Sequence, residues 1–174
     1  LLRRGAQKVY SIDVGYGQLA WKLQSDPRVE VHDRTNVRTL DPASVAPAPG
    51  LVVGDMSFIS LTLVLPALVG AAAPDADFLL MVKPQFEIGK ERLGHGGVVR
   101  NPEHHVETVE NVARCAIGLG LDIAAIAASP LPGPSGNVEY FLFMRRAYPD
   151  PIKADELTDY IRRAVAEGPA GRQS

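Results

Sequence analysis

The sequence predicts an α/β protein built on a mostly parallel sheet. Short apolar runs typical of buried strands alternate along the chain with segments in which leucine, valine and alanine recur at helical spacing. Two of these runs, Leu51–Val53 and Leu79–Val82, are each followed closely by a charged residue, Asp55 and Lys83. Such runs are expected to be buried on both faces, with helices on either side of the sheet. Because ligands of open α/β sheets bind beyond the carboxyl ends of the strands, Asp55 and Lys83 are candidate site residues.

The first half of the chain contains three predicted strands and two predicted helices. The apolar runs predict strands at 9–14, 28–32 and 51–54. A short helix is expected at 18–24, because Asp26 and Pro27 end it. The prolines within 41–50 predict a loop, and the leucine-rich segment 61–72 predicts the second helix.

The second half repeats this alternation. Strands are expected at 78–82, 121–128 and 138–145. Pro102 suits the first position of a helix capped by Asn101, and this helix is expected to run to about Leu119. An amphipathic closing helix is expected at 154–166, and the glycine-rich segment 85–101 and the turn-rich segment 129–137 are expected to be loops.

Composition indicates one ordinary globular domain. The chain has 174 residues, 46% of them hydrophobic and 22% charged, with a net charge of −2, so its overall charge does not point to nucleic acid. Cys115 is the single cysteine, which excludes an intramolecular disulfide and fits a reducing, cytoplasmic setting. The longest apolar stretch, Leu61–Ala73, is too short to span a bilayer.

A glycine motif at Gly15–Ala20 allows three interpretations. It fits the pattern G-x-G-x-x-A after a strand, and Asp33 follows at the spacing of a ribose-binding acid, which indicates an NAD-dependent oxidoreductase. Alternatively, Asp13 is itself the ribose-binding carboxylate and the cofactor's glycine-rich loop lies upstream of this chain. The third interpretation is a tight turn between a strand and a helix.

Longer motifs resemble a known family. The segments DVGYGQLAW, VKPQFE and SPLPGPSGNVEYF are similar to those of the TlyA family, hemolysin A-like proteins with an FtsJ-like catalytic domain, and the resemblance extends from about Leu1 to Pro169. It implies a Rossmann-like methyltransferase fold with an antiparallel last strand. It also implies S-adenosylmethionine as cofactor, ribosomal RNA or ribosomal subunits as partners, and methylation of a ribose 2′-hydroxyl. A membrane-acting hemolysin is the alternative that the family's older name suggests.

The resemblance also assigns site residues. The family's catalytic set is Lys-Asp-Lys-Glu, and its last three members map onto Asp55, Lys83 and Glu139. The residues that the resemblance places at the cofactor are Asp13 and Val14 near the ribose, Asn36 and Val37 near the adenine, and Asp55 near the methyl donor.

RNA contacts are expected from one aromatic residue and several cations. Phe58 follows the candidate catalytic acid and is expected either to stack on a flipped base or to join the core. The cations expected at RNA phosphates are Lys90, Arg92, Arg100 and Arg145. The alternative is that the loop 85–101 is merely solvated and binds no RNA. No metal is expected, and His104 and His105 are expected to be surface residues.

The resemblance implies that parts of the family's domain lie upstream of this chain. Residues 1–169 are expected to form an N-terminally truncated methyltransferase domain, with a flexible tail at 170–174 and an S4-like RNA-binding domain upstream. The first strand, the cofactor's glycine-rich loop and the first catalytic lysine are absent from this sequence. That strand is expected to lie between strands 9–14 and 51–54, so the chain alone is expected to bind the cofactor poorly and to have little activity.

Overall fold

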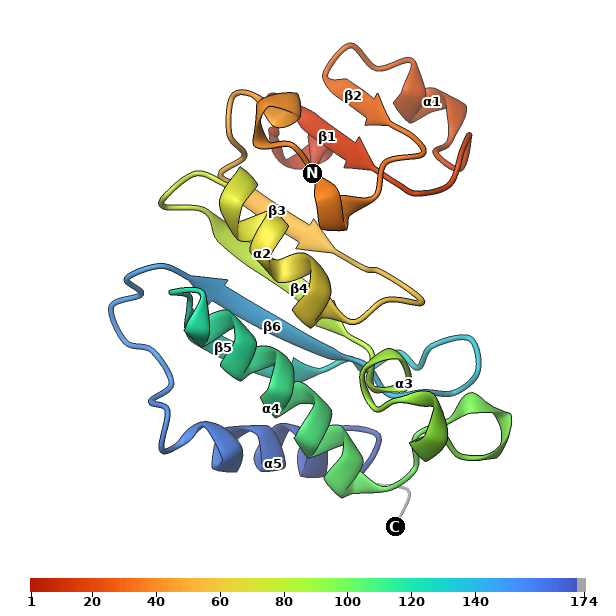
Figure 1. Cartoon of the computed structure of the whole chain (residues 1–174), viewed down its shortest axis with the longest axis vertical. Helices are drawn as coiled ribbons and strands as arrows, with labels where there is room; N and C mark the ends of the chain where they lie inside the picture. Colours follow the sequence, from red (N-terminus) through yellow and green to blue (C-terminus); the bar gives the residue numbers. More distant parts are fainter. Residues whose placement is uncertain (172–174) are drawn as a thin grey trace.

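The computed structural model describes residues 1–171, in which six strands form two sheets. The smaller sheet pairs β1 (Val9–Ile12) with β2 (Val29–His32). The larger sheet has the order β3-β4-β6-β5, with bounds Leu51–Gly54 for β3, Asp77–Val82 for β4, Tyr140–Arg145 for β6 and Asp122–Ala128 for β5. Figure 1 shows the smaller sheet at the top and the larger sheet below it.

Strand direction brings three segments to the same edge of the larger sheet. β3 and β4 are parallel, with Val53 opposite Leu79, whereas β6 is antiparallel to both β4 and β5. The predicted antiparallel last strand is therefore confirmed. Because β6 runs the opposite way, its first residue lies at the edge where β3 and β4 end.

Within residues 1–171, three long α-helices and two short ones accompany the sheets. Their bounds are Trp21–Gln24 for α1, Leu61–Ala71 for α2, Pro84–Glu87 for α3, Pro102–Gly118 for α4 and Leu157–Glu167 for α5. The side chain of Asn101 accepts a hydrogen bond from the backbone N–H of Glu103, as the predicted cap of α4 requires. Ser60 caps α2 in the same way at Thr62.

The core lies between one face of the larger sheet and the helices α2, α4 and α5. Alternate residues of the central strands point into it, and Phe78, Leu80, Tyr140, Leu142 and Met144 are fully buried. The helices contribute buried leucine, valine and isoleucine side chains to the same cluster. All three long helices thus cover a single face, on the near side of the sheet in Figure 1.

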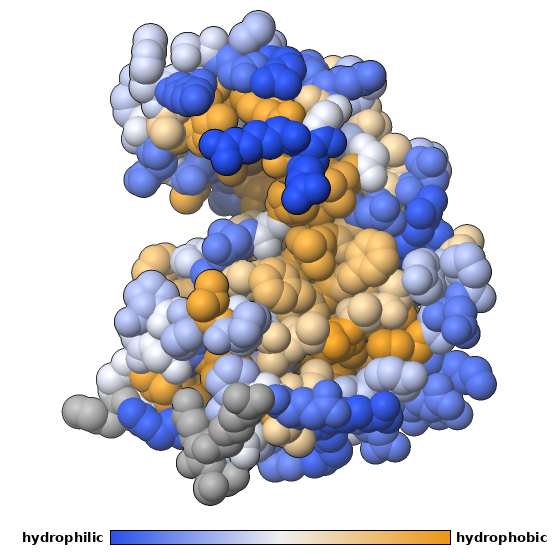
Figure 2. Space-filling model, turned by 180° about the vertical axis from the view of Figure 1, so that it is seen from behind, coloured by the Kyte–Doolittle hydropathy of each residue, from blue (hydrophilic) through white to orange (hydrophobic). Residues whose placement is uncertain are grey.

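The opposite face of the larger sheet is apolar and partly exposed. Leu51 is 46% exposed, Val53 48% and Leu79 39%. Figure 2, seen from behind, shows a broad hydrophobic surface over this part of the molecule. The prediction that strand 51–54 is buried on both faces is wrong, because no helix among residues 1–171 covers this second face.

The smaller sheet is attached through helix α2 and not through the larger sheet. Within the described residues, β1 pairs with β2 alone and β3 with β4 alone. The 3-10 turns at Val37–Thr39 and Pro42–Val45 pack on α2, and Leu40 and Val45 form a small buried cluster with Ala71. Figure 2 shows the surface hollowed between the upper and lower parts of the molecule.

The tail expected at 170–174 falls largely beyond the described residues. Residues 172–174 lie outside them, and Ala170 is buried in the core.

Candidate active site

The amine of Lys83 lies between two carboxylates. Its Nζ is 2.6 Å from Asp55 Oδ1 and 3.6 Å from Glu139 Oε1. It also donates a hydrogen bond of 3.2 Å to the hydroxyl of Ser57. The side chains of Lys83 and Glu139 are only 11% and 9% exposed, whereas that of Asp55 is 66% exposed. The structure therefore brings together three residues that are far apart in the sequence.

The topology of the sheet explains this convergence. Asp55 directly follows β3 and Lys83 directly follows β4, so both lie at the carboxyl edge of parallel strands. Glu139 directly precedes the antiparallel β6 and lies at the same edge. A Cβ at Gly133 would lie 2.9 Å from Glu139 Oε1, so the turn-rich loop approaches this carboxylate closely only because residue 133 is glycine.

The residues expected at the cofactor lie at the corresponding edge of the smaller sheet. Asp13 follows β1 with an exposed side chain, and its Oδ1 accepts a hydrogen bond from Gly15 N–H at 2.7 Å. Val14 is 75% exposed. Asn36 caps the turn Val37–Thr39, and the backbone N–H of Thr35 bonds to Asp13 O, which ties this turn to the end of β1.

The glycine motif does not form a dinucleotide-binding loop. Asp33 accepts a hydrogen bond from Gly17 N–H at 2.9 Å, so its carboxylate closes the turn. α1 begins only at Trp21 and has four residues, so the glycines do not lead directly into the N-terminus of a long helix. The geometry therefore favours the interpretation in which Gly15 and Gly17 are turn residues.

The loops beyond β3 and β4 carry four of the five residues expected at RNA. Phe58 is 90% exposed and its ring lies 5.0 Å from that of Phe86, so the alternative of a core role for Phe58 is wrong. Lys90 is exposed, as is Arg100. Arg92 forms a bidentate ion pair with Glu107 at 2.6 Å, so its guanidinium is engaged within the protein.

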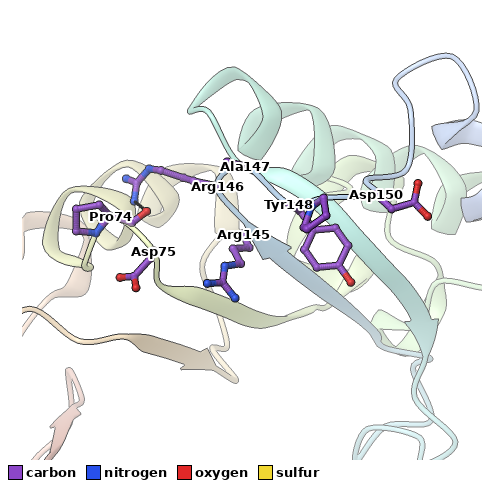
Figure 3. Close-up of a pocket in the computed structure, with 8 residues that line it drawn as sticks. Pro74, Asp75, Arg145, Arg146, Ala147, Tyr148 and Asp150 are labelled. Carbon is purple, nitrogen blue, oxygen red and sulfur yellow. Dashed lines mark hydrogen bonds between the residues drawn. The ribbon is translucent and has the colours of Figure 1, made fainter.

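Arg145 does not lie at this edge of the sheet. It ends β6, so it is at the opposite edge from Lys83, and it lies 3.5 Å from Asp77. A shallow pocket of about 650 Å³ occurs there, and Figure 3 shows Asp75, Arg145 and Asp150 around it. The antiparallel direction of β6 thus separates Arg145 from the loop cations Lys90, Arg92 and Arg100.

Sequence reasoning missed two residues that shape the site. Ser57 contacts Lys83, but a serine in a loop carries no distinctive signal. Asn137 is buried; its side chain accepts from Val99 N–H and donates to Gly97 O, both at 2.9 Å. It thereby joins the loop that follows β4 to the loop that precedes β6. Its place beside a turn-forming Ser-Gly pair was the only hint in the sequence.

One expected surface histidine is buried instead. His105 is 1% exposed on the inner face of α4, and its Nε2 is 2.9 Å from Val99 O. Burial lowers the pKa of His105, since the charged imidazolium is the costlier form in an apolar setting. Among residues 1–171, no group of three or more potential metal ligands lies together. In that same part of the chain, no helix has the length and apolar character needed to cross a membrane.

Comparison with known proteins gives concordant results. The FtsJ-like methyltransferase family model matches residues 1–146. The chain is 54% identical over 169 residues to the Mycobacterium tuberculosis protein named 16S/23S rRNA (cytidine-2′-O)-methyltransferase TlyA, which covers 97% of this chain and 63% of that relative. The chain thus spans less than two thirds of this relative's length.

Solved structures agree with the sequence matches. A protein from Streptococcus thermophilus titled as a candidate hemolysin has a TM-score of 0.85 at 32% identity, over 99% of this chain and 63% of the other. A methyltransferase dependent on S-adenosylmethionine, from Methanosarcina mazei, has a TM-score of 0.56 at 14% identity, over 83% of this chain and 84% of the other. At that identity the likeness concerns the fold alone.

Proposed function

Because the chain belongs to the FtsJ-like methyltransferase family, we propose that it carries the catalytic part of an enzyme that methylates ribose 2′-hydroxyl groups of ribosomal RNA, with S-adenosylmethionine as methyl donor. The family resemblance and the Rossmann-like fold expected from the motifs are confirmed. The observation that carries the proposal is the buried Lys83 amine between Asp55 and Glu139 at the carboxyl edge of the sheet. Ribosomal RNA would place the enzyme in the cytoplasm.

The chemistry of 2′-O-methylation suits this arrangement. A ribose hydroxyl is a weak acid, so the site must orient it and help to remove its proton. As a neutral amine, Lys83 would accept that proton, and as an ammonium it would stabilise the negative charge that develops on the oxygen. The carboxylates of Asp55 and Glu139 fix the direction of the Lys83 side chain.

The residues of the smaller sheet fit one end of the cofactor. S-adenosylmethionine supplies an electrophilic methyl group on a positively charged sulfur. The exposed carboxylate of Asp13 suits the two ribose hydroxyls, and the exposed side chain of Val14 suits an apolar ring face. Asn36 and Val37, held at the end of β1 by Thr35, would line the adenine side.

The loops beyond β3 and β4 would receive the RNA. Phe58 presents an exposed ring beside the catalytic acid, which suits stacking on a base that has left its helix. Lys90 and Arg100 lie on the loop after α3, within reach of phosphates next to that base. Arg92 would contribute only after release from Glu107.

We further infer that the complete enzyme contains one more strand between β1 and β3. One edge of each of these two strands is unpaired within residues 1–171, and in the same residues the face that exposes Leu51, Val53 and Leu79 lacks a covering helix. Unpaired strand edges beside an apolar face are unfavourable in an isolated domain. The Mycobacterium relative is longer than this chain, which covers 63% of it, and the expected S4-like domain belongs to the same proposal.

The test is methylation of ribosomal RNA by the complete protein with radiolabelled S-adenosylmethionine. Wild-type protein should label RNA at a ribose, as mass spectrometry of the nucleosides would show. Lys83→Met should lower the rate by about 100-fold or more, since it removes the proton-transfer group. Lys153→Met, an exposed control before α5, should leave the rate unchanged. Wild-type turnover in Lys83→Met would remove Lys83 from the mechanism.

A further inference from the structure

The loops after β3 and β4 contact each other at three successive points. The pairs, in order of distance from the strand ends, are Lys83 with Asp55, Phe86 with Phe58, and Glu87 with Ser60. The first pair is the candidate catalytic one, and the second is the exposed aromatic pair. The third joins the last residue of α3 to the N-cap residue of α2, and it takes no part in the chemistry described above.

Glu87 caps helix α2 from another segment of the chain. Its Oε1 accepts a hydrogen bond of 2.8 Å from the backbone N–H of Leu61, the first residue of α2. Its Oε2 accepts a hydrogen bond of 2.5 Å from the hydroxyl of Ser60, which is the N-cap residue. A carboxylate at a helix N-terminus also interacts favourably with the helix dipole. Glu87 therefore fixes the point at which the loop from Asp55 enters α2.

The hydrogen bonds around Ser60 leave little freedom. A serine hydroxyl has one proton, and in this arrangement Glu87 receives it. The hydroxyl of Thr62, 2.7 Å away, must then donate to Ser60, and the backbone N–H of Thr62 also donates to it. The network is complete only while the side chain of residue 87 can accept two hydrogen bonds.

The hydrogen bonds of Glu87 do more than cap helix α2. Burial raises the pKa of Glu87 because the charged form loses hydration, and the bonds from Ser60 and Leu61 oppose that rise. Capping alone needs no buried acid, since Ser60 already bonds to Thr62 N–H. What Glu87 adds is a link between the two loops that carry Asp55 and Lys83.

We propose that Glu87 is a positioning residue, which sets the distance between Asp55 and Lys83 by anchoring the first loop to the second. This inference rests on the proposed methyltransferase function. The loop from Asp55 to Ser60 and the segment from Lys83 to Glu87 are both short, so a shift at their far ends moves the catalytic pair. A displacement of about 1 Å at reacting groups costs on the order of 100-fold in rate.

The experiment compares Glu87→Ala and Glu87→Gln with a matched control in the complete protein. Asp122→Ala is the control, because its carboxylate also accepts one backbone N–H, from Tyr148 at 2.9 Å, but at the opposite edge of the sheet. Glu87→Ala should lower kcat by about 10- to 100-fold, with the KM for RNA and the Kd for S-adenosylmethionine within about threefold of wild type. Glu87→Gln keeps one acceptor oxygen, so its kcat should lie between those of the wild type and Glu87→Ala. Asp122→Ala should retain wild-type kcat.

Hydrogen exchange gives a second measurement that does not depend on activity. Exchange across residues 55–62, including the amide of Leu61, should be faster in Glu87→Ala than in the wild type or in Asp122→Ala. If the wild-type protein methylates no RNA, the proposed function fails, and this exchange pattern alone decides whether Glu87 anchors the loop. Wild-type kcat in Glu87→Ala, or an equal loss of kcat in Asp122→Ala, would overturn the proposal. Should Glu87→Ala not fold, Glu87→Gln decides by the same criteria.

Discussion

Phe58 combines an unusual backbone conformation with an unusual exposure. Its φ is +64°, a left-handed value that bulky residues rarely adopt, and its side chain is 90% exposed. Such strain costs on the order of 1–3 kcal/mol, and an exposed ring offsets little of it in the free protein. A residue of this kind is expected to contribute through a ligand that covers it.

Replacement of Phe58 tests whether its ring contributes by contact with RNA. Phe58→Gly removes the ring and relieves the backbone strain, whereas Phe58→Trp keeps an aromatic surface. Since base stacking is worth about 1–3 kcal/mol, Phe58→Gly should lower kcat/KM for RNA by about 5- to 150-fold, without loss of stability in thermal melts. Phe58→Trp should stay close to wild type. Equal kcat/KM values in the wild type and Phe58→Gly would show that the ring does not contact RNA.

The sequence predicted site residues to different extents, for identifiable physical reasons. Asp55 and Lys83 follow strands of one parallel pair, so the strand-end rule brings them to one edge. Glu139 precedes an antiparallel strand, and only the family resemblance indicated it. Ser57 and Glu87 act through contacts between loops, which depend on loop conformation and leave no periodic pattern in the sequence.

At the scale of elements, the hydrophobic pattern located the strands and the long helices well. β3 has the predicted bounds, and α2 and α4 each end one residue earlier than expected. The strand expected at 9–14 stops at Ile12, because the backbone N–H of Gly15 turns back to donate a hydrogen bond to the carboxylate of Asp13. The burial of β3 was mispredicted, since a continuous apolar run cannot reveal whether a covering helix belongs to the same segment of chain.

Two neighbouring arginines give a test at this scale. Arg146 donates to the carbonyl oxygens of Val69, Ala73 and Pro74 at 3.0–3.4 Å, and so binds the C-terminal end of α2. Arg146→Met should lower the free energy of unfolding by about 1–3 kcal/mol, because it leaves these half-buried acceptors unpaired. Arg145→Met loses one surface ion pair and should cost about 0–1 kcal/mol. Urea denaturation measures both, and an equal effect of the two changes would contradict this role of Arg146.

At the scale of the whole molecule, the candidate cofactor residues and the catalytic residues lie on separate sheets. Asp13 lies at the end of β1 and Asp55 at the end of β3, and these strands do not pair within residues 1–171. A complete cofactor site therefore requires the two sheets to be held at a fixed distance. The proposed additional strand would do this through backbone hydrogen bonds on both sides.

The isolated 174-residue chain should consequently behave differently from the complete protein. Calorimetry should give a Kd for S-adenosylmethionine at least about tenfold weaker in the isolated chain than in a protein that carries the proposed additional strand, since that strand would hold the two sheets at a fixed distance. The isolated chain should also associate with itself in light scattering, because its apolar sheet face and strand edges are exposed. Equally tight cofactor binding by the isolated chain would refute the need for an additional strand.

The side-chain amide of Asn137 links the loop that follows α3 to the loop that precedes β6. It bonds to Gly97 and Val99 in the loop expected to touch RNA, and it stands two positions before Glu139. A substitution of Asn137 is therefore expected to disturb both the loop proposed to contact RNA and the position of Glu139. A change of the loop that adapts it to a new RNA target must therefore keep both hydrogen bonds of the Asn137 amide. The choice of RNA target and the catalytic rate are coupled through this one side chain.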